Sequence, residues 1–210
     1  MLESYLTVCR EAKAETIEKK SRFITHVKPV ASEEDAQTFL AVLRKLYWDA
    51  SHHVYAYQIG LQNPVQRQSD DGEPSGTAGL PVLDAIRAAR LTNVMVVVVR
   101  YFGGTLLGTG GLVRVYGHAA KEGLRLAGVV EMTLGQRFYV TVPYPLAGRL
   151  QFQLEQAHYR IETVEYTDAV RFCVIARVCL CQALEALVMN ATDGQAGIER
   201  AGEPAYTDSC

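Results

Sequence analysis

The stretch "NVMVVVVRYFGGTLLGTGGLVRVYGHAA", residues 93–120, decides how this chain is organised. Its first seven residues are almost all apolar, which predicts a strand over 93–99 that is buried on both faces. Five glycines follow within residues 103–111, and apolar side chains then recur at helical spacing to about residue 127. The sequence therefore predicts a strand, a glycine-rich loop and a helix over about 110–127 in direct succession.

A glycine-rich loop between a strand and a helix can serve either of two purposes. The N–H groups at a helix N-terminus attract phosphate or carboxylate, whereas glycine also permits a tight turn and close packing of helix on sheet. Two nucleotide-binding patterns fail here, because Thr109 stands where a phosphate loop needs lysine and Val113 where a dinucleotide loop needs glycine or alanine. An anion-binding role and a purely structural role both stay open.

The helix after this loop carries basic residues on one face. Arg114, His118, Lys121 and Arg125 are spaced by four, three and four residues, so they share a face. With Arg100 at the strand's end they would form a basic stripe, and a solvated helix face is the other interpretation. The candidate residues for anion or nucleic-acid binding are Arg100, Gly103, Gly104, Thr105, Gly108, Thr109, Gly110, Gly111, Arg114 and Lys121.

The stretch "SDDGEPSGTAG", residues 69–79, concentrates three carboxylates, those of Asp70, Asp71 and Glu73. Close carboxylates can bind a hard cation or include a general base. The spacing is not that of a calcium loop, and Asp-Gly and Pro-Ser-Gly are typical of turns, so the other interpretation is a turn leading into a helix near Pro81. We predict no metal and no cofactor, and name Asp71 and Glu73 as catalytic candidates only if the protein is an enzyme. The predicted supporting loop comprises His52, Asp70, Asp71, Glu73, Ser75 and Thr77.

The remaining pattern indicates a second unit that begins near residue 129, so that the chain divides into 1–128 and 129–210. Before the glycine loop we expect a strand, turn and strand over 14–30, a capped helix over 32–47, a strand over 53–60, a loop over 61–79 and a short helix to residue 90. After residue 129 the expected order is strand, helix, strand, strand, helix, strand, which is the ferredoxin-like arrangement. These six elements fall at 136–142, 145–157, 159–166, 169–179, 181–190 and 196–201.

Composition and charge limit the classes of partner. The 210 residues carry a net charge of −2, divided into +2 over residues 1–128 and −4 over residues 129–210, so an anionic partner would prefer the N-terminal part. No apolar run is long enough for a membrane span, and the start lacks the pattern of a secretory signal. The odd number of cysteines, five, favours a reduced, cytoplasmic protein. We expect no membrane partner.

Four stretches carry a resemblance to the YigZ/IMPACT family of small cytoplasmic proteins: residues 18–27, 52–57, 69–79 and 92–116. The resemblance covers roughly residues 15–127, and position 53 carries His where several relatives have Asn. It implies an α+β protein of two α/β-sandwich domains. The IMPACT-type N-terminal domain would be similar to the second domain of a small-subunit ribosomal protein of the S-five type. The C-terminal domain would be similar to the ferredoxin-like domain at the end of elongation factor G.

The same resemblance implies a place in translation, because both of those relatives work on ribosomes or RNA. The eukaryotic branch of the family is associated with control of translation initiation. We therefore expect a non-enzymatic cytoplasmic binding protein linked to regulation of translation, which contacts RNA or a ribosome-associated partner through the Gly103–Gly111 loop. The alternatives are an enzyme acting on a phosphorylated or anionic small molecule, and a protein–protein adaptor.

Overall fold

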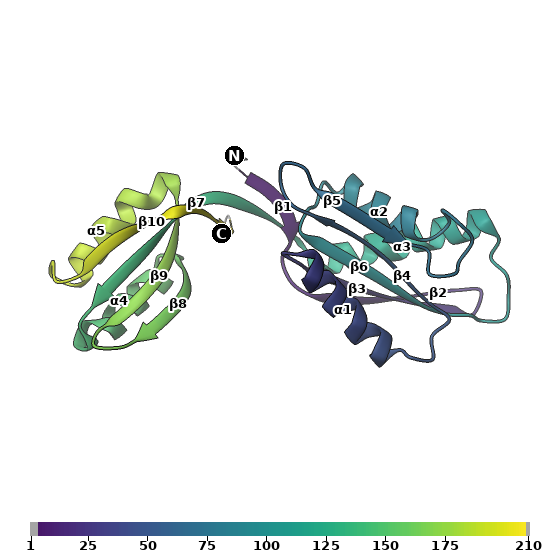
Figure 1. Ribbon diagram of the computed structural model, residues 1–210, viewed down its shortest axis with the longest axis horizontal. Coiled ribbons are helices and arrows are strands. Elements are labelled where there is room, and N and C mark those ends of the chain that lie inside the picture. Colours follow the sequence, from purple (N-terminus) through teal and green to yellow (C-terminus); the bar gives the residue numbers. More distant parts are fainter. Residues whose placement is uncertain (1–3, 209–210) are drawn as a thin grey trace. The chain divides into compact units, whose positions relative to one another are not determined.

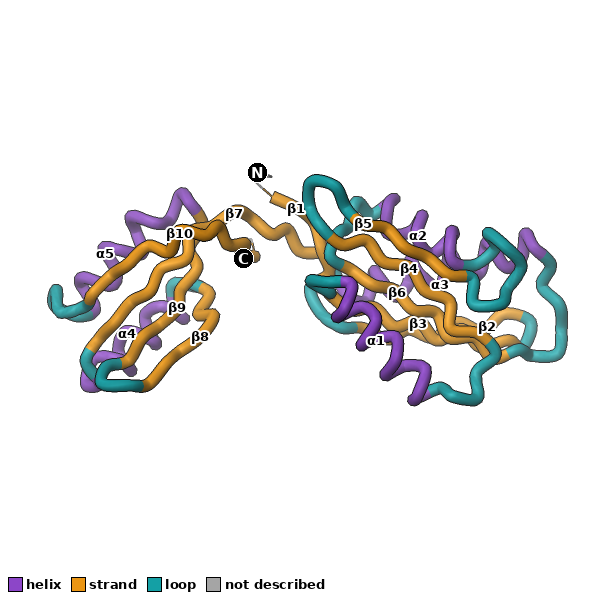
Figure 2. The backbone as a smooth tube through the Cα atoms, in the orientation of Figure 1, coloured by secondary structure: helices purple, strands orange, loops and turns teal. Residues whose placement is uncertain are grey.

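The computed structural model describes residues 4–208 and divides the chain into two compact units. One unit spans Tyr5–Val130, and the other begins at Glu131. Each unit combines helices with an antiparallel sheet, as Figures 1 and 2 show. The predicted two-domain α+β class is thereby confirmed.

The first unit is built on a five-stranded sheet with helices on both faces (Figure 1). The strand order is β2–β3–β6–β4–β5, and every neighbouring pair is antiparallel. Helix α1 packs on one face, and helices α2 and α3 pack on the other. The strands are β2 (Ala12–Glu18), β3 (Ser21–Pro29), β4 (His52–Ile59), β5 (Val65–Ser69) and β6 (Val94–Tyr101); the helices are α1 (Glu33–Leu46), α2 (Gly79–Ala88) and α3 (Thr109–Ala127).

Strand β6 forms the middle of this sheet and contributes to two hydrophobic cores. Val94, Val96 and Val98 pack with α2 and α3, whereas the alternate residues at 95, 97 and 99 pack with α1. All six side chains are fully buried. This follows from the period-two geometry of a strand, and it confirms the prediction of a strand buried on both faces.

Two local signals in the sequence act as expected. Lys19 and Lys20, both with positive φ, form the two-residue turn between β2 and β3, the conformation that suits a tight hairpin. Ser32 caps α1, because its Oγ accepts a hydrogen bond from the N–H of Asp35 at 3.1 Å. The Asp35 carboxylate in turn accepts from the N–H of Ala31, not from that of Ser32.

Two strands were not anticipated from the sequence. Strand β5 lies inside residues 61–79, where a loop was expected, and β1 (Ser4–Val8) precedes the first expected strand. The sequence of β5, "VQRQS", lacks alternating apolar residues because β5 lies at the edge of the sheet, beside β4. Edge strands without a buried face carry no period-two hydrophobic signal.

The second unit has the ferredoxin-like strand order β10–β7–β9–β8, with all of these pairs antiparallel. Its core includes Phe138, Leu150, Phe172 and Leu184, which are fully buried. Strand β7 begins seven residues earlier than expected, and β10 continues to Asp208. The elements are β7 (Val129–Val142), α4 (Tyr144–Gln156), β8 (Arg160–Tyr166), β9 (Val170–Arg177), a short turn of 3-10 helix (Val178–Leu180), α5 (Cys181–Ala191) and β10 (Gly197–Asp208).

Between residues 4 and 208, no helix is long and apolar enough to cross a membrane. Cys9, Cys173, Cys179 and Cys181 are free thiols, and Cys210 lies outside the described residues.

Candidate functional site

The glycine loop is held in place by backbone geometry at three of its glycines. A Cβ atom at Gly103 would lie 2.1 Å from the carbonyl carbon of Lys20, so only glycine lets the loop pass the β2–β3 hairpin. The Gly103 N–H also donates to Ser21 Oγ at 3.1 Å. Gly104 and Gly108 have φ values of +82° and +72°, which other residues adopt at a cost. These three glycines therefore have a structural explanation.

The remaining two glycines lie in the first turn of α3, which begins without a side-chain cap. The first intrahelical bond runs from the N–H of Leu112 to the carbonyl of Gly108. The N–H groups of residues 109–111 have no acceptor among the residues that the structure describes. A Cβ atom at Gly110 would meet nothing within 4 Å, and no acidic residue lies in this turn. The start of α3 is therefore open and electropositive.

Asp70 caps helix α2. Its Oδ1 accepts hydrogen bonds from the N–H groups of Ala78 and Gly79 at 3.0 and 2.8 Å, and its Oδ2 accepts from Gly76 at 2.9 Å. Burial by itself raises the pKa of this carboxyl, but the three N–H donors outweigh burial and leave the pKa below its ordinary value. Asp70 thus fulfils the capping interpretation of this loop.

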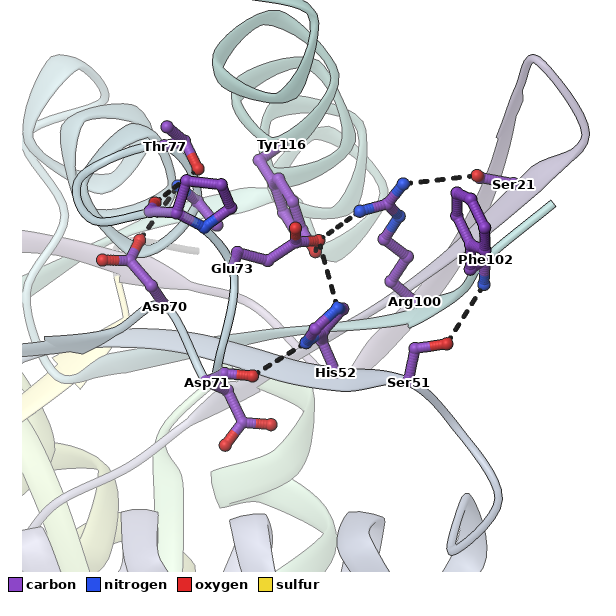
Figure 3. Close-up of polar contacts among 12 residues, drawn as sticks. Ser21, Ser51, His52, Asp70, Asp71, Glu73, Thr77, Arg100, Phe102 and Tyr116 are labelled. Carbon is purple, nitrogen blue, oxygen red and sulfur yellow. Dashed lines mark hydrogen bonds and ion pairs between the residues drawn. The ribbon is translucent and has the colours of Figure 1, made fainter. Parts of the chain in front are cut away.

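The side chain of Asp71 points away from the Glu73 carboxylate (Figure 3). Its Oδ2 accepts from the N–H of His53 at 2.7 Å, and its Oδ1 lies 3.2 Å from Arg44 on α1. The carbonyl of Asp71 accepts from Nδ1 of His52 at 2.8 Å, so that nitrogen carries a proton. The Asp71 carboxylate is therefore occupied by β4 and α1, whereas the Glu73 carboxylate, described below, has other partners.

Ser75 and Thr77 belong to the turn that leads into α2. Thr77 is buried, and its hydroxyl donates to the carbonyl of Pro74 at 2.6 Å, while Ser75 is exposed on the turn. Within the described residues, no three or more His, Cys, Asp or Glu side chains gather in a way that suits a metal ion. The three carboxylates of residues 70–73 are separated because each serves a different backbone or side-chain partner.

Glu73 is the centre of a buried polar cluster (Figure 3). Its side chain is only 4 % exposed, and its Oε1 accepts from Nη1 of Arg100 at 2.5 Å and from the hydroxyl of Tyr116 at 2.7 Å. Nε2 of His52 lies 3.8 Å from the same oxygen. Burial raises the pKa of the Tyr116 hydroxyl, and its bond to Glu73 raises it further. Tyr116 therefore stays protonated as a hydrogen-bond donor.

Arg100 lies in this cluster and not in the exposed stripe expected from the sequence. Its side chain is 5 % exposed, and its guanidinium carbon lies 5.4 and 5.6 Å from the ring centroids of Phe23 and Phe102. Nη2 is 3.5 Å from Ser21 Oγ, whereas Nε has no hydrogen-bond partner in the described structure. The positive charge of Arg100 is balanced by Glu73, so this residue adds no net charge to the surface.

Two hollows meet at Leu107 in the glycine loop. The first, here called the apolar pocket, has a volume of about 400 Å³, and it brings together residues of both sequence motifs. The second, here called the basic pocket, has a volume of about 350 Å³. The apolar pocket is lined by His52, Glu73, Pro74, Arg100, Phe102, Leu106, Leu107, Gly108, Thr109 and Leu112; the basic pocket is lined by Thr16, Glu18, Lys19, Leu107, Gly111, Arg114, Val115 and His118.

The basic pocket contains a cation that the sequence did not indicate. Lys19 comes from the β2–β3 turn and lies with Arg114 and His118 of α3. The charged turn was visible in the sequence, but its approach to α3 depends on sheet pairing over a long sequence distance. Lys121 is exposed farther along α3, and Arg125 is paired with Glu122 at 3.0 Å. Thr105 is exposed in the loop.

Comparison with known proteins agrees with this two-domain α+β architecture. Residues 19–124 match the family described as "Impact N-terminal domain", and residues 140–195 match a domain of unknown function, DUF1949. The chain belongs to the IMPACT family, which confirms the resemblance of its motifs.

Three similar proteins illustrate the match. The IMPACT family member YvyE of Bacillus subtilis is 37 % identical over 208 residues, which cover 99 % of this chain and 95 % of that protein. A crystal structure of a hypothetical protein has a TM-score of 0.63 at 30 % identity and covers 97 % of this chain and 100 % of that one. The structure of the two-domain translational regulator Yih1 has a TM-score of 0.37 at 28 % identity and covers 59 % of this chain and 47 % of that one.

Proposed function

We propose that this protein is a non-enzymatic binding protein linked to translation, and that it contacts RNA phosphates with the start of α3 and the cations around it. Translation is the process that membership of the IMPACT family implies. The observation that carries the RNA contact is a set of unpaired cations beside an open helix N-terminus. Lys19, Lys20, Arg114 and Lys121 are exposed and form no ion pair within residues 4–208.

The geometry suits a sequence-independent contact. Lysine and arginine neutralise phosphates and release counterions, and backbone N–H groups at a helix start bind phosphate oxygens without reading the base. The net charge is +2 over residues 1–128 and −4 over residues 129–210. We therefore place the contact within the first unit, on one local surface.

A salt-dependent titration tests this proposal. The full chain is titrated with a fluorescent single-stranded RNA at several salt concentrations. We expect the logarithm of the association constant to fall linearly with the logarithm of salt concentration, by about 0.7 per neutralised phosphate. Arg114→Ala and Lys19→Ala should each reduce that slope by about 0.7–1.

The matched control is Arg160→Ala, because Arg160 is an exposed arginine on β8 of the second unit. It should leave the slope unchanged. Undetectable binding, or a slope that neither Arg114→Ala nor Lys19→Ala changes, would overturn the proposed phosphate contact.

The convergence of both motifs on the apolar pocket favours a second candidate function, an enzyme acting on an anionic small molecule. An enzyme needs reactive groups and an anion-holding backbone in one concave site, and His52, Glu73 and the start of α3 meet this requirement. Turnover of phosphorylated small molecules, followed by mass spectrometry, should then be lost in Glu73→Gln and kept in Asp71→Asn. A wild-type protein that converts none of them excludes this candidate for those compounds.

A further inference from the structure

The wall of the apolar pocket exposes apolar side chains to an unusual degree. Leu106 is 83 % exposed and Phe102 is 48 % exposed. Both line the apolar pocket together with Leu112, which is buried. Exposed apolar side chains that gather around a concave surface often mark a ligand-binding site. A volume of about 400 Å³ falls in the range of small-molecule sites, roughly 300–1,000 Å³.

The ring of Phe102 favours a flat occupant. The Arg100 guanidinium lies 5.6 Å from the centroid of this ring, and the Phe102 N–H donates to Ser51 Oγ at 3.2 Å. The hydrogen bond holds the backbone of Phe102, and the guanidinium lies beside its ring, while about half of the residue's surface stays exposed. A half-exposed aromatic ring is a platform on which a nucleobase can stack.

The floor of the apolar pocket is polar but has no net charge. Arg100 and Glu73 compensate each other, and both side chains are at least nine-tenths buried. Nη1 and Nη2 of Arg100 are engaged by Glu73 and Ser21, and its Nε is enclosed by protein atoms. A neutral base therefore suits this floor better than a second charged group.

The other end of the apolar pocket is the start of α3. Gly108 and Thr109 line the hollow, and their helix presents the unbonded N–H groups of residues 109–111. The space beside Gly110 is open, so a phosphate can approach the backbone closely. Beyond Leu107, Lys19 and Arg114 line the basic pocket, where a neighbouring phosphate would find positive charge.

We propose that the apolar pocket binds one unpaired nucleotide, with its base against Phe102 and its phosphate on the N-terminus of α3. This inference rests on the proposed RNA contact, and it specifies that a single unpaired nucleotide is the part of the RNA that is recognised. A base inside a duplex is stacked and paired, so it cannot enter the hollow. The site therefore selects single-stranded ends or looped-out bases, and a free nucleoside monophosphate offers the same chemistry.

The test compares single-stranded RNA with a blunt duplex of the same length on the full chain. We expect tighter binding of the single strand, and about tenfold weaker binding of that strand by Phe102→Ala, the scale of one lost base stack. Leu106→Asp, a change at a side chain that is 83 % exposed, should weaken it similarly because it places a negative charge at the pocket rim. Phe152→Ala is the control, because Phe152 is an exposed phenylalanine on α4.

The outcomes distinguish RNA from a free nucleotide as the ligand, and the nucleotide pocket from the proposed phosphate contact. Binding of adenosine 5′-monophosphate alone that Phe102→Ala weakens supports the pocket and identifies a free nucleotide as its source. Equal affinity for duplex and single strand, or inorganic phosphate competing as well as the nucleotide, overturns base recognition. If salt-dependent binding persists but Phe102→Ala and Leu106→Asp leave it unchanged, the pocket inference fails while the proposed phosphate contact stands.

Discussion

A single oxygen atom, Oε1 of Glu73, joins the two motifs that the sequence displays separately. It accepts from Arg100, which lies near the end of β6, and from Tyr116, which lies in α3. A buried ion pair adds little net stability relative to apolar packing, but removing one partner leaves an uncompensated buried charge. The cluster therefore contributes little net stability, and its main effect is to hold the side chains at the floor of the apolar pocket in place.

We expect Arg100→Met to lower the free energy of unfolding by about 3–5 kcal/mol, because Glu73 would remain buried and unpaired. The double variant Arg100→Met/Glu73→Leu should recover part of this loss. Arg22→Met is the control: its ion pair with Glu15 is about half exposed, so the loss of that pair should lower the free energy of unfolding far less. Urea denaturation measures all three, and equal costs for Arg100→Met and Arg22→Met would contradict the buried pair.

His26 gives the first unit a pH-dependent component of stability. Burial, and secondarily the charge of Lys13, lower the pKa of His26 to about 4, from an ordinary value of 6.5. The unfolded chain therefore binds more protons between these values, so this component is complete above about pH 6.5 and is lost as the pH falls to about 4.

His26→Gln should remove that dependence while keeping a polar group near the Tyr47 hydroxyl, which lies 3.0 Å from Nε2 of His26. The stability difference between wild type and variant should change by roughly 2–3 kcal/mol between pH 7 and pH 4. Urea denaturation at several pH values measures this difference, with His118→Gln as the exposed control. A difference that is constant with pH would show that His26 titrates normally in the folded state.

At the scale of elements, the strand, glycine loop and helix could be predicted because their signals are local. A run of valines, clustered glycines and apolar residues at helical spacing each describe neighbouring residues. The partners of each side chain could not be predicted in the same way. The direction of Asp71, the burial of Arg100 and the approach of Lys19 all follow from the order β3–β6–β4 and from the hairpin beside Gly103, which no local pattern encodes.

A substitution in the first turn of α3 should affect stability and RNA affinity in opposite directions. Gly110→Ala should raise the free energy of unfolding by about 0.5 kcal/mol, because alanine favours a helix more than glycine. The added methyl group occupies the open space beside the unbonded N–H groups, so RNA affinity should fall. Gly117→Ala, in the middle of α3 where a Cβ atom meets Pro81 only at 3.9 Å, should stabilise without changing affinity. Equal affinities for both variants would place the phosphate elsewhere.

At the scale of the whole molecule, every residue of the candidate site lies in the first unit, and the second unit has its own core. Leu150→Ala should destabilise the second unit by about 2–5 kcal/mol, since Leu150 is fully buried there. RNA affinity, measured at a temperature where both units remain folded, should not change. A loss of affinity would show that residues beyond 130 contribute to binding.

Strand β6 has a further consequence for how the protein opens. Because its side chains belong to the cores on both faces of the sheet, its amide protons can meet solvent only when both cores come apart. They should therefore exchange with deuterium at the slowest rate in the first unit. The glycine loop, which joins this strand to α3, is anchored to the β2–β3 hairpin at Gly103, and its largely exposed residues should exchange quickly. A ligand that orders the loop would then slow exchange in the loop while leaving β6 unchanged.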